Sequence, residues 1–199
     1  MKKALDIWAN RLRVDQRKNE AAIQALLFQK EFLSADVCRI TGIKSNTFGQ
    51  WLARGFIRPS RPAGRSGYRN VFTMEDLCRI ELFRLLTDSG FSRTNAAKFA
   101  FPAAEDGVSD KIERIFKKAI KAIKDYVTGG EGTLLTGSSR FPEPLFLAFW
   151  HSTEGTWVMD VNTVDQFTKL YKHLQFQSGA YVVNVTEIAN AVFEKIKSL

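Results

Sequence analysis

The side chains of this sequence best suited to chemistry are basic residues in a stretch that contains no acidic one. Between Val37 and Met74 there is no Asp or Glu, yet the stretch holds Arg39, Lys44, Arg54, Arg58, Arg61, Arg65 and Arg69. Cations that neutralise phosphates release condensed counterions from duplex DNA, which supplies much of the binding free energy. The net charge is +9 over residues 1–102 and −1 over residues 103–199, so the excess is local. A local excess predicts a polyanion-binding surface, with duplex DNA as the first candidate.

Two short helices are expected to position the first of these residues. Ser34 is a good N-cap for a helix over 35–41 that Gly42 ends, and Ser45 or Asn46 caps a second helix to about Arg54. Two helices joined by a tight turn predict a helix-turn-helix, whose second helix enters the major groove with its N-terminal side chains leading. The polar or cationic residues expected to reach base edges are Lys44, Ser45, Asn46, Thr47 and Gln50.

A hairpin is expected after the second helix. Phe56-Ile57 and residues 68–72 have strand character, and the residues between them are rich in Pro, Gly and Arg. Such a tip brings backbone close to a phosphate ridge. The arginines expected to hold phosphates are Arg54, Arg58, Arg61, Arg65 and Arg69. Beyond it, Thr73 is expected to cap a helix with Asp76 in the capping-box position, and Phe91-Ser92 to lead into another helix ending near Ala100.

The same region carries a family signature in seven ordered pieces. They are Gly42-Ile43, Thr47-Phe48, Trp51, Gly55-Phe56-Ile57-Arg58-Pro59, Gly67-Tyr68-Arg69, Thr73-Met74-Glu75-Asp76-Leu77 and Gly90-Phe91-Ser92. With them, residues 33–99 resemble the MerR-type winged helix-turn-helix family. The resemblance implies a four-helix DNA-reading head with a hairpin wing, usually in a homodimer on an inverted repeat. It also implies that Thr47 and its neighbours lie in the major groove, and that Tyr68 and Arg69 contact phosphate from the wing.

The chain departs from the family pattern in four respects, one of which is a wing that runs one residue longer after Tyr68-Arg69, with Asn70-Val71 before Phe72. Gly49-Gln50-Trp51 stands where the family commonly has Arg-Tyr-Tyr, which removes a frequent phosphate-binding arginine. About 30 residues precede the head. The family's metal- or thiol-sensing cysteines have no counterpart, so no cofactor and no metal site are expected, and Cys38 and Cys78 are interpreted as core residues.

An amphipathic helix is expected over 111–127, capped by Ser109-Asp110. Its apolar stripe is Ile112, Phe116, Ile120, Ile123 and Val127. In the resembled family a helix at this place pairs with its twin, which implies dimerisation through the stripe. The alternative is that the helix packs on its own C-terminal module, and the sequence leaves both open.

The remaining pattern alternates strands and helices. Strands are expected at 145–151, 157–160 and 181–184, and helices at 164–174 and 186–196. The fold class is therefore mainly α with an α+β second half. The expected organisation is an N-terminal helical extension (1–30), a winged helix-turn-helix head (31–102), an amphipathic linker or dimerisation helix (108–128) and a small α+β module (132–199).

These features favour a DNA-binding protein over an enzyme. His151, Ser152, Asp160 and His173 show no triad or metal-ligand spacing, and no run of the sequence is long and apolar enough for a membrane span or a signal peptide. The expected function is a sequence-specific transcriptional regulator, homodimeric, cytoplasmic and nucleoid-associated, of bacterial or phage type. Its partners would be duplex DNA, a second copy, and RNA polymerase or another protein through the C-terminal module. The alternatives are an architectural, excisionase-like accessory factor and a DNA-tethered adaptor.

Overall fold

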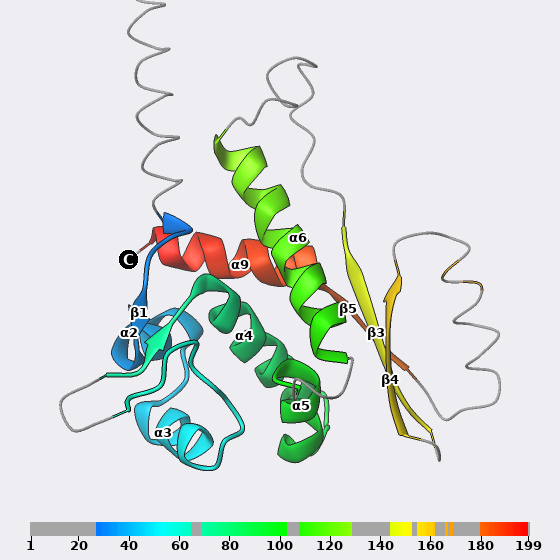
Figure 1. Cartoon of the computed structure of the whole chain (residues 1–199), viewed down its shortest axis with the longest axis horizontal. Helices are drawn as coiled ribbons and strands as arrows, with labels where there is room; N and C mark the ends of the chain where they lie inside the picture. Colours follow the sequence, from blue (N-terminus) through cyan, green and yellow to red (C-terminus); the bar gives the residue numbers. More distant parts are fainter. Residues whose placement is uncertain are drawn as a thin grey trace, which may run out of the picture.

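The first half of the chain is mainly helical, and the second half adds a small sheet (Figure 1). The computed structural model describes residues 27–64, 69–102, 108–128, 144–152, 155–161, 166, 168 and 180–198. In the first half the elements are β1 (Phe32–Leu33), α2 (Ser34–Thr41), α3 (Ser45–Ala53), β2 (Val71–Phe72), α4 (Met74–Asp88) and α5 (Arg93–Ala100). In the second half they are α6 (Val108–Thr128), β3 (Phe146–Ser152), β4 (Gly155–Val161), β5 (Ala180–Asn184) and α9 (Val185–Lys197). The expected mixture of dominant helix with small antiparallel sheets is confirmed.

The helix ends follow the sequence signals with small corrections. Gly42 ends α2 in the left-handed conformation, at φ 72°, and its N–H bonds to the carbonyl of Cys38 at 2.9 Å. Thr73 and Asp76 form the expected capping box of α4, and the hydroxyl of Ser92 caps α5. The expected cap at Ser34 is wrong, because Ser34 is already helical and Leu33 is the N-cap.

Helix α3 begins at Ser45, whereas a cap at Ser45 would make Asn46 its first residue. Lys44 is its N-cap and provides no side-chain hydrogen bond, so the caps predicted at Ser45 or Asn46 are wrong and both residues lie within the helix. Gly55 follows the helix at φ 71°, a conformation that glycine adopts without strain. The first N–H groups of α3 therefore remain without a side-chain acceptor from the cap residue.

The strand partners of the expected hairpin differ from the prediction. Val71–Phe72 pairs antiparallel with β1, Phe72 opposite Phe32, and not with Phe56-Ile57. A single bridge joins Val71 to Arg61 and closes a loop between them. The sequence did not predict β1, because a two-residue strand is too short to show alternation. The Ile57 side chain is instead buried, at 1% exposure.

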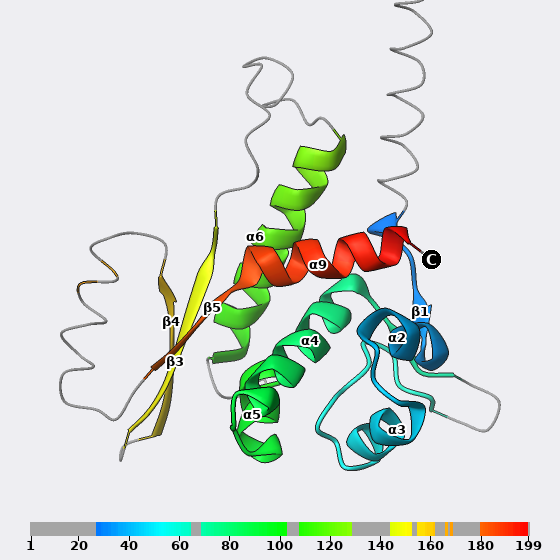
Figure 2. The ribbon, with the colours of Figure 1, turned by 180° about the vertical axis from the view of Figure 1, so that it is seen from behind.

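One continuous hydrophobic core unites the head with the C-terminal helix. Helix α4 lies at its centre, with Leu77, Ile80 and Phe83 fully buried. Helix α9 crosses α4 and α6 and reaches α2, so segments from opposite ends of the chain lie side by side (Figures 1 and 2). Its Phe193 ring stacks on Phe28 at 4.9 Å between centroids. The head and the second half are therefore not separated by a polar boundary.

The second half contains an antiparallel sheet of order β4-β3-β5. Strands β3 and β4 form the expected hairpin, with Ser152 opposite Gly155, and Leu147 faces Val183 across β3 and β5. Asn184 caps α9 through its side chain, and the helix begins at Val185, one residue before the predicted start at Thr186. The helix predicted at 164–174 and the extension before residue 27 lie outside the described residues, apart from residues 166 and 168.

Helix α6 begins at Val108, so Ser109 and Asp110 lie in its first turn and the cap predicted there is wrong. Its apolar stripe faces the core of its own chain: Ile112, Phe116 and Ile123 are at most 1% exposed, whereas Ile120 and Val127 are half-buried. The helix packs on α9, α4 and β4. Of the two possibilities that the sequence left open, the described residues show the packing within one chain.

Candidate nucleic-acid interface

Helix α3 presents the residues predicted to read bases on its exposed side. Lys44, Ser45, Asn46 and Gln50 are exposed and Thr47 is half-buried. The opposite face is held by aromatic contacts. Phe48, 2% exposed, packs edge-on against Phe72 at 5.6 Å between centroids, and Trp51 packs edge-on against Phe83 at 4.9 Å. These contacts fix the rotation of α3 about its axis, which determines which side chains point outward.

The turn between α2 and α3 is fixed by one hydroxyl and one apolar side chain. Thr41 Oγ1 donates to the carbonyl of Val37 at 2.7 Å and accepts from the N–H of Ile43 at 3.4 Å. Ile43 itself is buried, at 7% exposure. The angle between the two helices is therefore set by buried contacts, as a helix-turn-helix requires.

The basic residues around α3 are exposed and few of them have acidic neighbours. The exposed cations include Arg54, Arg58 and Arg69, which make no ion pair with any described residue; Lys44 makes none either. Arg61 Nη2 lies 2.8 Å from a carboxylate oxygen of Glu31, an exposed pair in which water competes strongly. The predicted contacts Arg65 and Tyr68 lie outside the described residues. Arg54, Arg58, Arg69 and Lys44 are thus free to meet a polyanion, whereas Arg61 and Arg39 each already face a carboxylate, that of Glu31 and that of Asp36.

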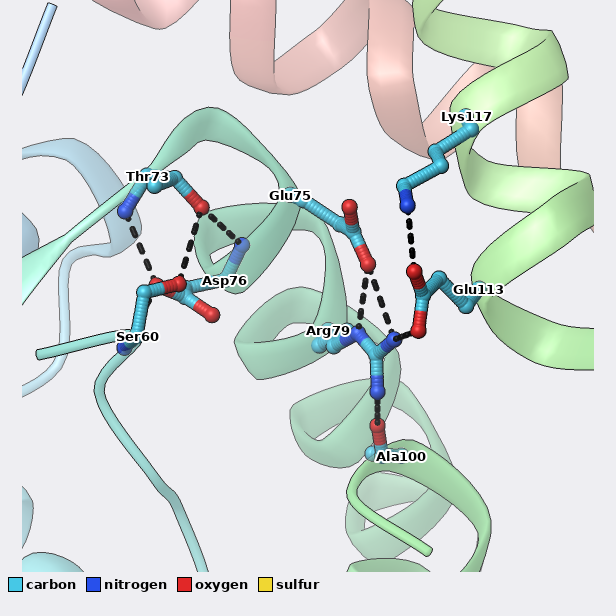
Figure 3. A network of polar contacts seen from close by, with 8 residues as sticks. All are labelled: Ser60, Thr73, Glu75, Asp76, Arg79, Ala100, Glu113 and Lys117. Atoms are coloured by element: carbon cyan, nitrogen blue, oxygen red, sulfur yellow. Dashed lines mark hydrogen bonds and ion pairs between the residues drawn. The ribbon is translucent and has the colours of Figure 1, made fainter. Parts of the chain in front are cut away.

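The loop that follows α3, here called the basic loop (residues 58–71), is closed by backbone pairing. Arg61 and Val71 exchange two backbone hydrogen bonds, at 2.9 and 3.2 Å, and the N–H of Ala63 donates to Asn70 Oδ1 at 2.8 Å. Near the loop's base, Ser60 donates from both its N–H and its hydroxyl to the carboxylate of Asp76 (Figure 3). The loop therefore has a defined stem next to α3.

A second polar cluster joins α4, α5 and α6 beside the loop (Figure 3). Arg79 donates to Glu75 at 2.8 Å and to the carbonyl of Ala100 at 3.5 Å, and lies 3.9 Å from Glu113. Glu113 also accepts a hydrogen bond from Lys117, which lowers the pKa of Glu113 and raises that of Lys117. Arg79 is almost buried, so its charge supports the packing of the helices and is not part of the exposed basic surface.

Arg93 is a residue that the sequence reasoning missed. It is exposed at the start of α5 and borders a hollow at the C-terminal end of α3. Lining residues of that hollow include Trp51, Arg54, Phe56, Gly90, Phe91 and Arg93. A cation in the first turn of a helix opposes the helix dipole. The carboxylate of Asp88 lines the same hollow, so the hollow carries charges of both signs.

The two cysteines lie inside the helical part of the molecule. Cys78 is fully buried and Cys38 half-buried, and burial raises the pKa of both thiols. A thiol with a raised pKa stays protonated at neutral pH and is a weak nucleophile. Both residues pack in or against the core, as predicted.

No helix in the described part of the chain has the length and apolar character of a membrane span.

The arrangement so far is a helix-turn-helix with an exposed polar helix and a basic loop. Residues 32–100 match the model of the MerR HTH family regulatory proteins. The resemblance inferred from seven motif pieces is thereby confirmed over the stretch that carried them. The MerR-type segment begins at β1 and ends with α5, so it includes α3, the basic loop and Arg93. It does not include α6, the three-stranded sheet of β4, β3 and β5, or α9. No curated protein matches the chain.

Proposed function

We propose that this chain is a sequence-specific, duplex-DNA-binding transcriptional regulator rather than an enzyme. One observation carries the proposal: the exposed side of α3 presents Lys44, Ser45, Asn46 and Gln50, and the chain from Val37 to Met74 holds exposed arginines and no acidic residue. The match of residues 32–100 to a family of regulatory proteins supports it. Such a protein acts where the DNA is, in the cytoplasm of a bacterium or a phage-infected cell, associated with the nucleoid.

In this proposal the helix and the loop have different tasks. Asn46 and Gln50 carry side-chain amides, which pair bidentately with adenine in the major groove. Lys44 serves guanine or a neighbouring phosphate, and Ser45 and Thr47 contact base edges or backbone. The phosphate contacts come from Arg54, Arg58, Arg61, Arg65, Tyr68 and Arg69, together with Arg93 beside α3. Phosphate contacts set orientation and affinity, and base contacts set specificity.

The surface left for dimerisation bears on how many copies of the chain bind one DNA site. A homodimer reads an inverted repeat, with one head for each half-site. In this chain the apolar stripe of α6 is buried in its own core, so a dimer must use another surface. That observation favours the second candidate, a monomeric accessory factor of the excisionase type that shapes DNA for a protein partner. RNA polymerase or another protein would then contact the second half of the chain.

Selection from a random library of duplexes, with the full-length protein at near-physiological salt, tests the proposal. An enriched inverted repeat would support a dimeric regulator, and its centre-to-centre spacing reports the distance between the two heads. Enrichment of single or direct-repeat sites would favour the accessory factor. A control selection with a Lys44→Ala, Asn46→Ala, Gln50→Ala triple variant should lose the enrichment. If wild-type protein enriches no sequence, the proposal of sequence-specific binding is wrong.

A further inference from the structure

We propose that Asp76 is the positioning residue for the outgoing side of the basic loop, residues 58–64, holding Arg58 and Arg61 in place for phosphate contact. The inference rests on the proposed DNA-binding function and names the residue through which the fold preorganises it. Asp76 touches no DNA in this proposal. It acts through Ser60, on the outgoing side of the loop, and through Thr73, two residues beyond its end (Figure 3).

Three donors converge on a single oxygen of the Asp76 carboxylate. Oδ2 accepts from the Ser60 N–H at 3.0 Å, from the Ser60 hydroxyl at 2.6 Å and from the Thr73 N–H at 2.9 Å. Hydrogen bonds to an ionised carboxylate are about twice as strong as those between neutral groups. The bond from Thr73 belongs to the capping box of α4, but neither bond from Ser60 is required for a helix cap. The carboxylate therefore does more than begin a helix.

The outgoing side of the loop has little else to position it. From Arg58 to Gly64 no side chain is buried, so the hydrophobic contacts that fix α3 do not extend into this stretch. The returning side differs, because Phe72 is fully buried. Polar contacts must therefore define the outgoing side: the Ser60 bonds to Asp76, a 3.4 Å contact between the Ser60 and Thr73 hydroxyls, the Arg61–Val71 pair, the exposed Arg61–Glu31 ion pair and the Ala63 bond to Asn70. Of these acceptors, only Asp76 belongs to a helix.

The Asp76 side chain is itself held in a fixed position. Asp76 is 7% exposed and precedes Leu77 and Cys78, both fully buried at the centre of the core. Arg61 adjoins Ser60 and Arg58 lies two residues before it, so a restraint on Ser60 limits where both guanidinium groups can go. Residues already ordered before binding do not lose that conformational freedom when DNA arrives. Asp76 thus raises affinity without contributing a positive charge.

The test compares Asp76→Ala with Thr73→Ala in the full chain. Both variants weaken the same capping box, but Thr73→Ala keeps both Ser60 bonds to the carboxylate and removes only the long, 3.4 Å contact between the Ser60 and Thr73 hydroxyls. Hydrogen exchange without DNA is followed at the amides of Ser60, Ala63 and Val71, with buried amides of α4 as internal reference. Asp76→Ala should speed exchange at these amides by roughly tenfold or more relative to the reference, and Thr73→Ala should not. Equal exchange in the two variants would overturn the inference.

DNA binding is then measured for the same variants over a range of salt concentrations. Asp76→Ala should bind the selected duplex roughly tenfold more weakly, with a salt slope lower by about 1–2, while Thr73→Ala keeps the wild-type slope. Ser60→Ala, which leaves the cap untouched, should shift both readouts in the same direction by less. Faster exchange with unchanged binding in Asp76→Ala would also overturn the inference. If wild-type protein binds no DNA at all, the proposed function fails, whereas the exchange result still reports whether Asp76 orders the loop.

Discussion

The phenol of Tyr181 donates a hydrogen bond to the backbone carbonyl of Ser89 at 2.7 Å, which joins strand β5 to the turn after α4. Its ring packs edge-on against Phe91, with 4.5 Å between centroids. Phe91 borders the hollow that Trp51 and Arg54 of the α3 region also line. The sheet of the second half is therefore fixed to the part of the head next to α3.

This contact predicts a measurable loss of stability. Tyr181→Phe removes the hydroxyl and should lower the free energy of unfolding by about 0.5–1.5 kcal/mol. Tyr181→Ala should cost more, because it also removes the ring contact with Phe91, worth about 0.5–1.5 kcal/mol beyond its buried area. Urea unfolding followed by circular dichroism measures both. Val182→Ala, at an exposed neighbour, is the control and should stay within about 0.5 kcal/mol of wild type. Equal stability of Tyr181→Phe and wild type would contradict the prediction.

Arg69 is predicted to contact a phosphate and no base. Arg69→Ala should weaken binding to every duplex sequence alike and reduce the slope of log K against log salt by about 1, because one fewer counterion is released. Fluorescence anisotropy at four or more salt concentrations gives the slope. Lys118→Ala makes the same change in net charge on α6, outside the MerR-type segment, and should leave the slope nearly unchanged. An unaltered slope in Arg69→Ala would exclude it from the phosphate contacts.

Asn46 and Gln50 are predicted to read bases. Alanine at either position should relax the preference at particular base pairs by about 1–3 kcal/mol and leave affinity for non-specific DNA almost unchanged. Binding to a set of single-base variants of the selected site checks this. Arg54→Ala provides the contrast, because a lost phosphate contact lowers all affinities together. A uniform loss in Asn46→Ala or Gln50→Ala would show that the residue does not read sequence.

The lowered pKa of Glu81 predicts how the free energy of unfolding depends on pH. Burial alone would raise the pKa of this carboxyl, but the hydrogen bonds and charges of Arg84 and Lys195 outweigh burial and lower it below the ordinary 4.5. A group whose pKa is lower in the folded state contributes stability above its unfolded pKa and loses it as the pH falls through the folded pKa. Glu81→Gln should therefore lower the free energy of unfolding at pH 7 by about 1–2 kcal/mol.

The pH series distinguishes this effect from simple packing damage. Wild type should lose more stability than Glu81→Gln between neutral pH and the acid range below about pH 4.5, so the two curves converge at low pH. Lys195→Met removes one partner from α9 and should reproduce part of the change, because Lys195 lies 3.5 Å from Glu81. Parallel curves over the whole pH range would mean that Glu81 does not titrate differently on folding.

Local signals in the sequence predicted most of the head. The left-handed glycines at 42 and 55, the capping box of α4 and the exposed polar side of α3 all lie where residue types and spacing indicated. Long-range pairings were missed. The apolar stripe of α6 shows that one face is buried, but the same stripe would suit a twin helix or α9, and only the fold decides between them. The partner of Val71–Phe72 is a two-residue strand without any periodicity to detect.

The position of α9 has a consequence for the synthesis of the protein. Val192, Phe193 and Ile196 complete the core against helices that are translated some hundred residues earlier. While α9 is still within the ribosome, the apolar faces of α4 and α6 lack this cover. A nascent chain that has released only its MerR-type segment therefore exposes apolar surface and invites chaperone binding. The head therefore reaches its full set of core contacts only after α9 has left the ribosome.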